Sequence, residues 1–68
     1  MKLSARNQLK GKITSVTKGA TTAHVTLDIG GALVTASITN AAVDELGLAE
    51  GKQAYAIIKA SDVMVGVE

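Results

Sequence analysis

The hydrophobic core of this chain has to be built almost entirely from aliphatic side chains. Of the 68 residues, 47% are hydrophobic, yet Tyr55 is the only aromatic residue and cysteine is absent. A single core of this size gives little net stability, and small scaffolds usually add a disulfide, a metal or a partner subunit. The lack of cysteine excludes disulfides and thiolate metal sites, and the single His24 excludes a histidine-rich one. We therefore expect residues 1–68 to form one domain that is stabilised by oligomerisation.

Alternation of apolar and polar residues with a period of two predicts a mainly β fold. The strands are expected at residues 7–17, 22–29, 32–38, 53–58 and 62–67. His24 falls on the outward face of the second strand, and Gly30-Gly31 predicts a hairpin turn because glycine accepts positive φ without a steric penalty. The unbroken apolar character of residues 54–58 indicates burial on both faces of that strand.

A short helix is predicted between the third and fourth strands. Thr39 or Asn40 can cap its N-terminus, and Gly47 can end it. Asp44 and Glu45 are expected in its first turn, where the helix dipole favours carboxylates. Five short strands with this helix describe an OB-like barrel. Because such small side chains fill a five-stranded barrel poorly, we expect exchange of strands between subunits to complete it.

Two donor-rich segments lie near the ends of the chain. Ser4 and Arg6 are two residues apart, so an extended backbone points both side chains to one face. Lys59 closes the fourth strand and is followed closely by Ser61, while Thr39 adds a hydroxyl at the helix N-terminus, which favours anions. Singly, a terminal arginine or a lysine at a strand end is more often simply solvated. Together they favour the binding of an oxyanion.

Several function classes fit the composition poorly. A formal net charge of +1 gives no broad basic surface for nucleic acid, and an OB-type nucleic-acid binder would also need aromatic residues for base stacking. No apolar run is long enough to cross a membrane, and Lys10 and Lys12 interrupt any signal-peptide core. Neither donor-rich segment pairs a nucleophile with a base. These features favour a cytoplasmic protein that is not an enzyme and binds neither nucleic acid nor membrane.

Three stretches resemble the molbindins, the small molybdenum–pterin-binding (Mop) domains. They are Ser-Ala-Arg-Asn-Gln-Leu-Lys-Gly-Lys at residues 4–12, Ser-Ile-Thr-Asn-Ala-Ala-Val-Asp-Glu-Leu-Gly-Leu at residues 37–48, and Ile-Ile-Lys-Ala-Ser-Asp-Val-Met at residues 57–64. The resemblance covers essentially the whole chain. The two terminal motifs are specific at this spacing, and the central one is less so.

The resemblance implies a cytoplasmic store or buffer of molybdate and of tungstate, with no catalytic cofactor. It further implies a homo-oligomer, a hexamer built as a trimer of dimers with exchanged strands, that holds the oxyanions at subunit interfaces. By matching position, the anion ligands would come from more than one subunit and would be Ser4, Arg6, Thr39, Lys59, Ser61 and backbone N–H groups around Ala60. The alternative is a molybdate-sensing regulatory module that acts through a separate partner protein.

The chemistry of the ligand agrees with this residue set. Molybdate at neutral pH is a tetrahedral dianion whose oxygens only accept hydrogen bonds, so burying it requires compensating charge and many donors. Arg6 and Lys59 supply two formal charges, and the hydroxyl groups supply neutral donors. Charge-assisted hydrogen bonds contribute about 1.5–3 kcal/mol each, so several of them together are compatible with micromolar binding.

Overall fold

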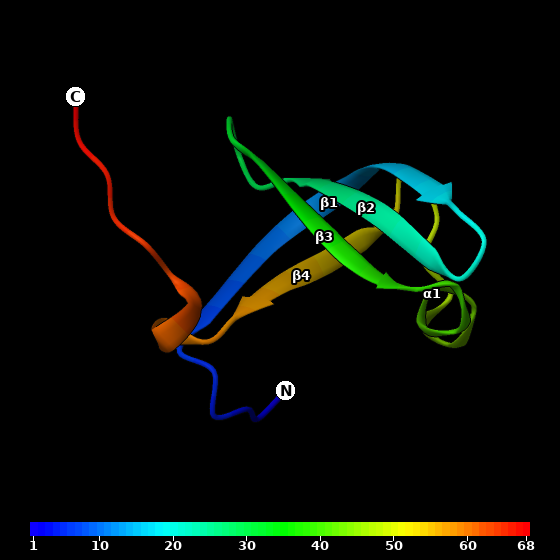
Figure 1. The fold of residues 1–68 in the computed structure, drawn as a ribbon, viewed down its shortest axis with the longest axis horizontal. Coiled ribbons are helices and arrows are strands. Elements are labelled where there is room, and N and C mark those ends of the chain that lie inside the picture. The colour runs from blue at the N-terminus through cyan, green and yellow to red at the C-terminus, as the bar shows by residue number, and fades with distance from the viewer.

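Four antiparallel strands form one curled sheet in the computed structural model, which describes residues 1–68 (Figure 1). The elements are β1 (Asn7–Lys18), β2 (Thr22–Asp28), β3 (Leu33–Thr39), α1 (Asn40–Leu46), β4 (Gln53–Ile58) and a 3-10 turn, η1 (Ala60–Asp62). The strand order is β3-β2-β1-β4, so β3 and β4 are the two edges. The mainly β class and the helix between the third and fourth strands are therefore confirmed. None of the helices is long and apolar enough to span a membrane.

The core is as thin as the composition indicates. Ala23, Val25 and Leu27 alternate along β2 and are buried, because that strand lies between β1 and β3 and turns one face inward. The whole buried cluster consists of Ile13, Ala23, Val25, Leu27, Val43 and Ala56. His24 is exposed on the outer face of β2, as expected.

The predicted fifth strand is not formed. Residues 60–62 make the turn η1, and residues 63–68 have no regular structure and lead away from the sheet (Figure 1). In η1 the backbone N–H of Asp62 donates to the carbonyl oxygen of Lys59 at 2.8 Å, and this turn directs the chain away from β4. Without a fifth strand, one chain forms an open sheet in place of the closed barrel that the sequence predicted.

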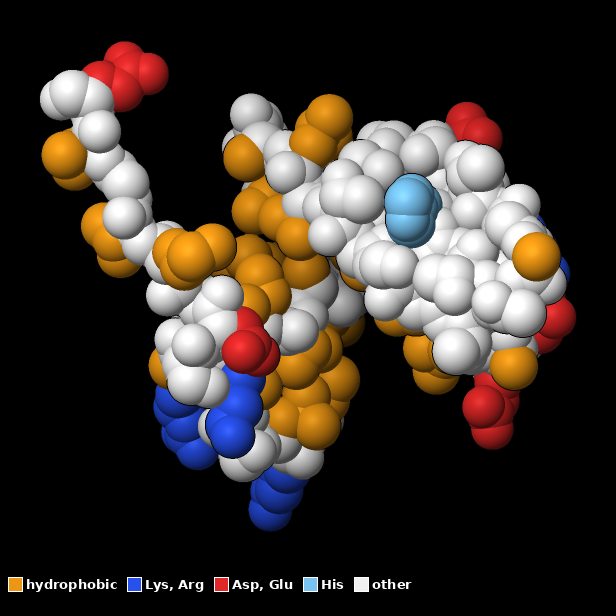
Figure 2. All heavy atoms as spheres, viewed as in Figure 1, with side chains coloured by type: hydrophobic (Ala, Val, Ile, Leu, Met, Phe, Trp, Pro, Cys, Tyr) orange, Lys and Arg blue, Asp and Glu red, His pale blue; other side chains and the backbone are white.

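The open sheet leaves an apolar groove between β3 and β4. Its volume is about 730 Å³, and 13 of its 15 lining residues are hydrophobic. Val34, Ala36 and Ile38 line it from β3, and Ala54 and Ala56 line it from β4. The space-filling view shows hydrophobic side chains gathered beside β4 (Figure 2). The groove lies where a further strand would close the barrel, since each edge strand pairs on one side only.

The expectation that β4 is buried on both faces is wrong for a single chain. Ala56 is 7% exposed on the inner face, whereas Tyr55 and Ile57 are 44% and 40% exposed. No element of the same chain covers the outer face of this edge strand, so its apolar side chains remain accessible to solvent.

Helix α1 begins and ends at the predicted residues. The hydroxyl of Thr39 accepts a hydrogen bond from the N–H of Ala42 at 3.0 Å, which identifies Thr39 as the N-cap, and Gly47 ends the helix with φ 64°. The placement of Asp44 and Glu45 in the first turn is wrong, because α1 starts at Asn40 and no acidic residue falls in that turn. Asp44 instead forms an ion pair with Lys18 of β1.

The β1–β2 pair is close-packed at Gly11. A Cβ atom at this position would lie 2.5 Å from the carbonyl oxygen of Asp28. We expect Gly11→Ala to lower the free energy of unfolding by about 1–3 kcal/mol, the usual cost of overpacking. Urea denaturation measures the effect, and Gly66→Ala is the matched control because nothing lies within 4 Å of its added Cβ. A Gly11→Ala protein as stable as the control would contradict the close packing.

The β2–β3 turn is held by the carboxylate of Asp28. Its Oδ1 accepts hydrogen bonds from the N–H groups of Gly30 and Gly31 at 2.9 and 3.1 Å. These two hydrogen bonds lower the pKa of Asp28 below its ordinary value of 3.8, and the bond from Gly30 has the larger effect. Both glycines have φ near +100°, a conformation that other residues rarely adopt.

We expect this turn to lose stability only in acid. Because the folded-state pKa is the lower one, the carboxylate stabilises the turn fully above the unfolded pKa of 3.8, and this contribution is lost as the pH falls through the folded pKa. Stability measured between pH 6 and pH 2 should therefore fall less steeply for Asp28→Ala than for the wild type. Equal pH slopes for the two proteins would contradict the assignment.

Candidate anion-binding site

The start of β1 and the end of β4 are paired directly, and this pairing builds the candidate site. In the antiparallel register Asn7 lies opposite Ile58. The side-chain amide of Asn7 also donates from Nδ2 to the carbonyl oxygen of Ile58 at 3.1 Å, which fastens the two strand ends together. The residues just beyond this pair are Arg6, immediately before β1, and Lys59, immediately after β4. Two cations that lie 53 positions apart in the sequence therefore become neighbours in space.

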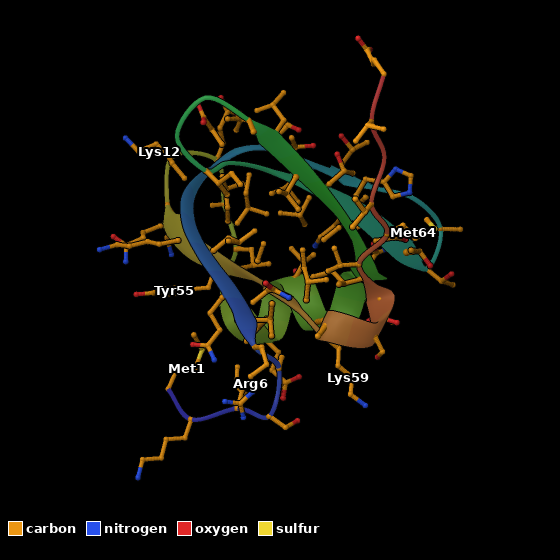
Figure 3. All side chains as sticks on the ribbon, turned by 90° about the vertical axis from the view of Figure 1, so that its left-hand side faces the viewer. Met1, Arg6, Lys12, Tyr55, Lys59 and Met64 are labelled. Atoms are coloured by element: carbon orange, nitrogen blue, oxygen red, sulfur yellow. The ribbon has the colours of Figure 1, made fainter.

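The side chains of Arg6 and Lys59 project from the same end of the molecule (Figure 3). Lys and Arg side chains also gather at this end in the space-filling view (Figure 2). The ion pair between Lys18 and Asp44 is the only one in the structure, so neither Arg6 nor Lys59 forms an ion pair, although the carboxylate of Asp62 follows Lys59 within η1. Both residues are exposed. The result is a solvent-accessible concentration of positive charge, which we call the Arg6–Lys59 cluster.

A local hydrogen bond orients the guanidinium group. Nε of Arg6 donates to the carbonyl oxygen of Ser4 at 3.2 Å, which leaves the terminal N–H groups of the fork available. The pairing of Ser4 and Arg6 on one strand face did not form as predicted, because β1 begins only at Asn7 and Ser4 lies in a bend before it. Ser4 nevertheless lies in the same short segment as Arg6, with its hydroxyl exposed.

The segment after β4 supplies the other half of the cluster. Lys59 precedes η1 and makes no side-chain hydrogen bond with it, and Ala60 and Ser61 are exposed within the turn. The first hydrogen bonds of η1 use the N–H groups of Asp62 and Val63. The N–H groups of Ala60 and Ser61 precede these bonds, as expected for the first residues of a helical turn. Hydroxyl, ammonium and backbone donors are therefore close together along three consecutive residues.

Thr39 lies apart from this cluster. It ends β3 and caps α1, which lies at the opposite end of the sheet from η1 (Figure 1). Within one chain the structure therefore brings together Ser4, Arg6, Lys59, Ala60 and Ser61 and leaves Thr39 remote. The hydroxyl of Thr39 is already used as an acceptor by the helix cap, although its proton remains free to be donated.

Two asparagines have structural roles that the sequence patterns did not indicate. Asn7 fastens the strand ends, as described above. Asn40 donates from Nδ2 to the carbonyl oxygen of Gly19 at 2.9 Å and from its backbone N–H to Thr21 at 2.9 Å, so it joins α1 to the β1–β2 turn. Its Oδ1 is buried without a hydrogen-bond partner. Because both contacts join residues far apart in the chain, local spacing contains no signal for them.

Comparison with known proteins identifies the family. The TOBE domain family matches residues 3–65. A probable molybdenum-pterin-binding protein of Haemophilus influenzae is 61% identical over 69 residues, and the match covers 100% of this chain and 100% of that protein. Molybdenum-pterin-binding protein 3 of Clostridium pasteurianum is 50% identical over 66 residues, which are 96% of this chain and 97% of that protein.

Solved structures give the same result. MopII from Clostridium pasteurianum has a TM-score of 0.90 and 46% sequence identity, and the match covers 97% of this chain and 100% of that one. A molybdate-binding protein from Sporomusa ovata has a TM-score of 0.93 at 33% identity, over 98% of this chain and 100% of that one. The cytoplasmic molybdate-binding protein ModG has a TM-score of 0.93 at 46% identity, and this chain spans 49% of it. The chain belongs to the TOBE-domain family, among its small Mop proteins, which confirms the resemblance found in the sequence.

Thr39 has a stabilising role that can be measured without any ligand. Removing an N-cap hydroxyl typically costs 0.5–2 kcal/mol, so we expect Thr39→Ala to lower the free energy of unfolding by about 1 kcal/mol. Thr39→Ser keeps the hydroxyl and serves as the control. Urea denaturation in anion-free buffer distinguishes the two variants. An unchanged stability for Thr39→Ala would mean that the cap is energetically unimportant.

Proposed function

We propose that this protein binds molybdate, and also tungstate, as a cytoplasmic oxyanion store. The observation that carries the proposal is the Arg6–Lys59 cluster, in which two exposed cations that form no ion pair flank the paired residues Asn7 and Ile58. A tetrahedral dianion would neutralise both charges and accept hydrogen bonds from several donors at once. The names of the relatives support this ligand, since they are described as molybdenum-pterin-binding or molybdate-binding proteins. Binding of this kind requires no acid–base chemistry, so the proposed role is not enzymatic.

The proposed ligands are Ser4, Arg6, Lys59, Ser61 and the backbone N–H around Ala60, with Thr39 from a second copy of the chain. The remote position of Thr39 within one chain supports a site shared between subunits, because only another copy can present that hydroxyl to the cluster. The open fork of Arg6 favours an oxyanion, since its planar N–H groups match two oxygens simultaneously.

We further propose that the protein is a hexamer, a trimer of dimers, in which C-terminal segments are exchanged. Residues 63–67 leave the sheet in an extended path, and Met64, Val65 and Val67 are more than 90% exposed. The apolar groove between β3 and β4 is the place in the fold that such a segment would fill. Residues 63–67 of another copy, paired with the edge strands β3 and β4, would close the five-stranded OB-like barrel. A core of six buried residues also supports completion by a partner.

Calorimetry of the purified protein tests the function. We expect saturable molybdate binding near neutral pH, and we expect Arg6→Ala and Lys59→Ala each to weaken it at least about tenfold, the equivalent of one charge-assisted hydrogen bond. Lys10→Ala is the matched control, because Lys10 is an exposed cation on β1, four residues after Arg6. Its affinity should equal that of the wild type.

Three outcomes would contradict the proposal. A protein that gives no heat with molybdate and retains no molybdenum after growth with it is not a molybdate store. Unchanged affinity in both Arg6→Ala and Lys59→Ala would place the binding site elsewhere. Equal weakening by Lys10→Ala would indicate a diffuse response to net charge in place of a defined site.

A further inference from the structure

The Arg6–Lys59 cluster lies at the point where the C-terminal segment leaves the sheet. Lys59 is the last residue before η1, and Val63 is the first residue after it. Only η1 therefore separates the cationic cluster from the apolar segment that the proposed exchange moves between chains. Any group that binds to residues 59–61 also fixes the direction in which residues 63–67 depart.

The sequence of the C-terminal segment fits a strand with one apolar face. Val63, Val65 and Val67 alternate with Met64 and Gly66, so an extended backbone presents the three valines together. Five residues of strand span about 16 Å at roughly 3.3 Å per residue, shorter than either edge strand, since β3 has seven residues and β4 has six. The segment is therefore short enough to lie along the groove between the two edges.

Exchange of the C-terminal segments carries an electrostatic cost at the Arg6–Lys59 cluster. When two copies exchange their C-terminal segments reciprocally, each chain crosses to its partner at η1, so the proposed exchange places both η1 turns at the contact between the copies. Each turn brings one Arg6–Lys59 cluster with it, so the proposed exchange adds four cations to the contact between the two copies. Like charges within about 8 Å of one another repel at physiological salt. A dianion held at each cluster removes this repulsion.

We propose that binding of the oxyanion at the Arg6–Lys59 cluster and exchange of residues 63–67 with a second copy of the chain are thermodynamically linked. The inference rests on the proposed function, because it needs an anion at the cluster, but it adds that the anion strengthens the assembly. By reciprocity, a chain that cannot exchange its segment binds the anion more weakly. The oligomer is then tighter when molybdate is abundant and looser when it is scarce.

Sedimentation velocity over a dilution series measures the linkage. With one anion site per chain that forms only in the exchanged state, molybdate at 100 times its Kd should tighten subunit association about 100-fold for each site. Sulfate at the same ionic strength is the control for general screening, after calorimetry has tested that it does not bind under these conditions. An association constant that changes by less than twofold while calorimetry shows saturable molybdate binding overturns the linkage and leaves the proposed function intact. Absence of molybdate binding overturns both.

Variants separate charge repulsion from packing. Lys59→Ala removes one cation from each cluster, so we expect it to assemble at least as tightly as the wild type without molybdate. Because its Kd is at least about tenfold weaker, the same molybdate concentration should tighten its association by at most about tenfold for each site. Val65→Ser weakens the apolar face of the segment and should lower both subunit association and molybdate affinity. Met64→Ser is its matched control, because Met64 lies on the opposite face of the extended segment. A Val65→Ser protein that dissociates but binds molybdate with wild-type affinity contradicts the inference.

Discussion

The pairing of the start of β1 with the end of β4 is the interaction on which the rest of this structure depends. The register that places Asn7 opposite Ile58 joins the two ends of the chain and makes neighbours of Arg6 and Lys59. The same pairing fixes β4 as an edge strand and so determines where the open groove lies. One local arrangement therefore positions the cations, the groove and the departing C-terminal segment together.

An incomplete core has consequences for function in so small a protein. Six aliphatic side chains are buried, while the inner groove and the outer face of β4 keep apolar groups accessible. Burying such surface is the main favourable contribution to association. In the site that we propose, which is shared between copies, the same contacts serve stability and ligand binding. The proposed assembly therefore accounts for the stability of a chain that has no cysteine and a single aromatic residue.

Sequence patterns predicted the four strands, the helix and its caps, because each depends on residues close together in the chain. The alternation of apolar and polar residues along β2 predicted which of its faces is buried, and Thr39 and Gly47 predicted the two ends of α1. Residues 62–67 show how this reasoning fails: their pattern is that of a strand, but a strand needs a hydrogen-bonding neighbour and one chain provides none there. The contact between Asn7 and Ile58 joins residues far apart in the chain, so it escaped prediction. The donor-rich segments were recognised by their composition, and the register of β1 with β4 explains why they lie at the same end of the sheet.

The position of the bound anion is the sharpest test of a binding site at the Arg6–Lys59 cluster. Anomalous diffraction at the molybdenum absorption edge, from crystals grown with molybdate, gives the position of each metal atom independently of the protein chain. We expect a peak within hydrogen-bonding reach of both Arg6 and Lys59 of one chain, with Thr39 of a neighbouring chain completing its surroundings. Peaks that avoid the Arg6–Lys59 cluster in every subunit would contradict it.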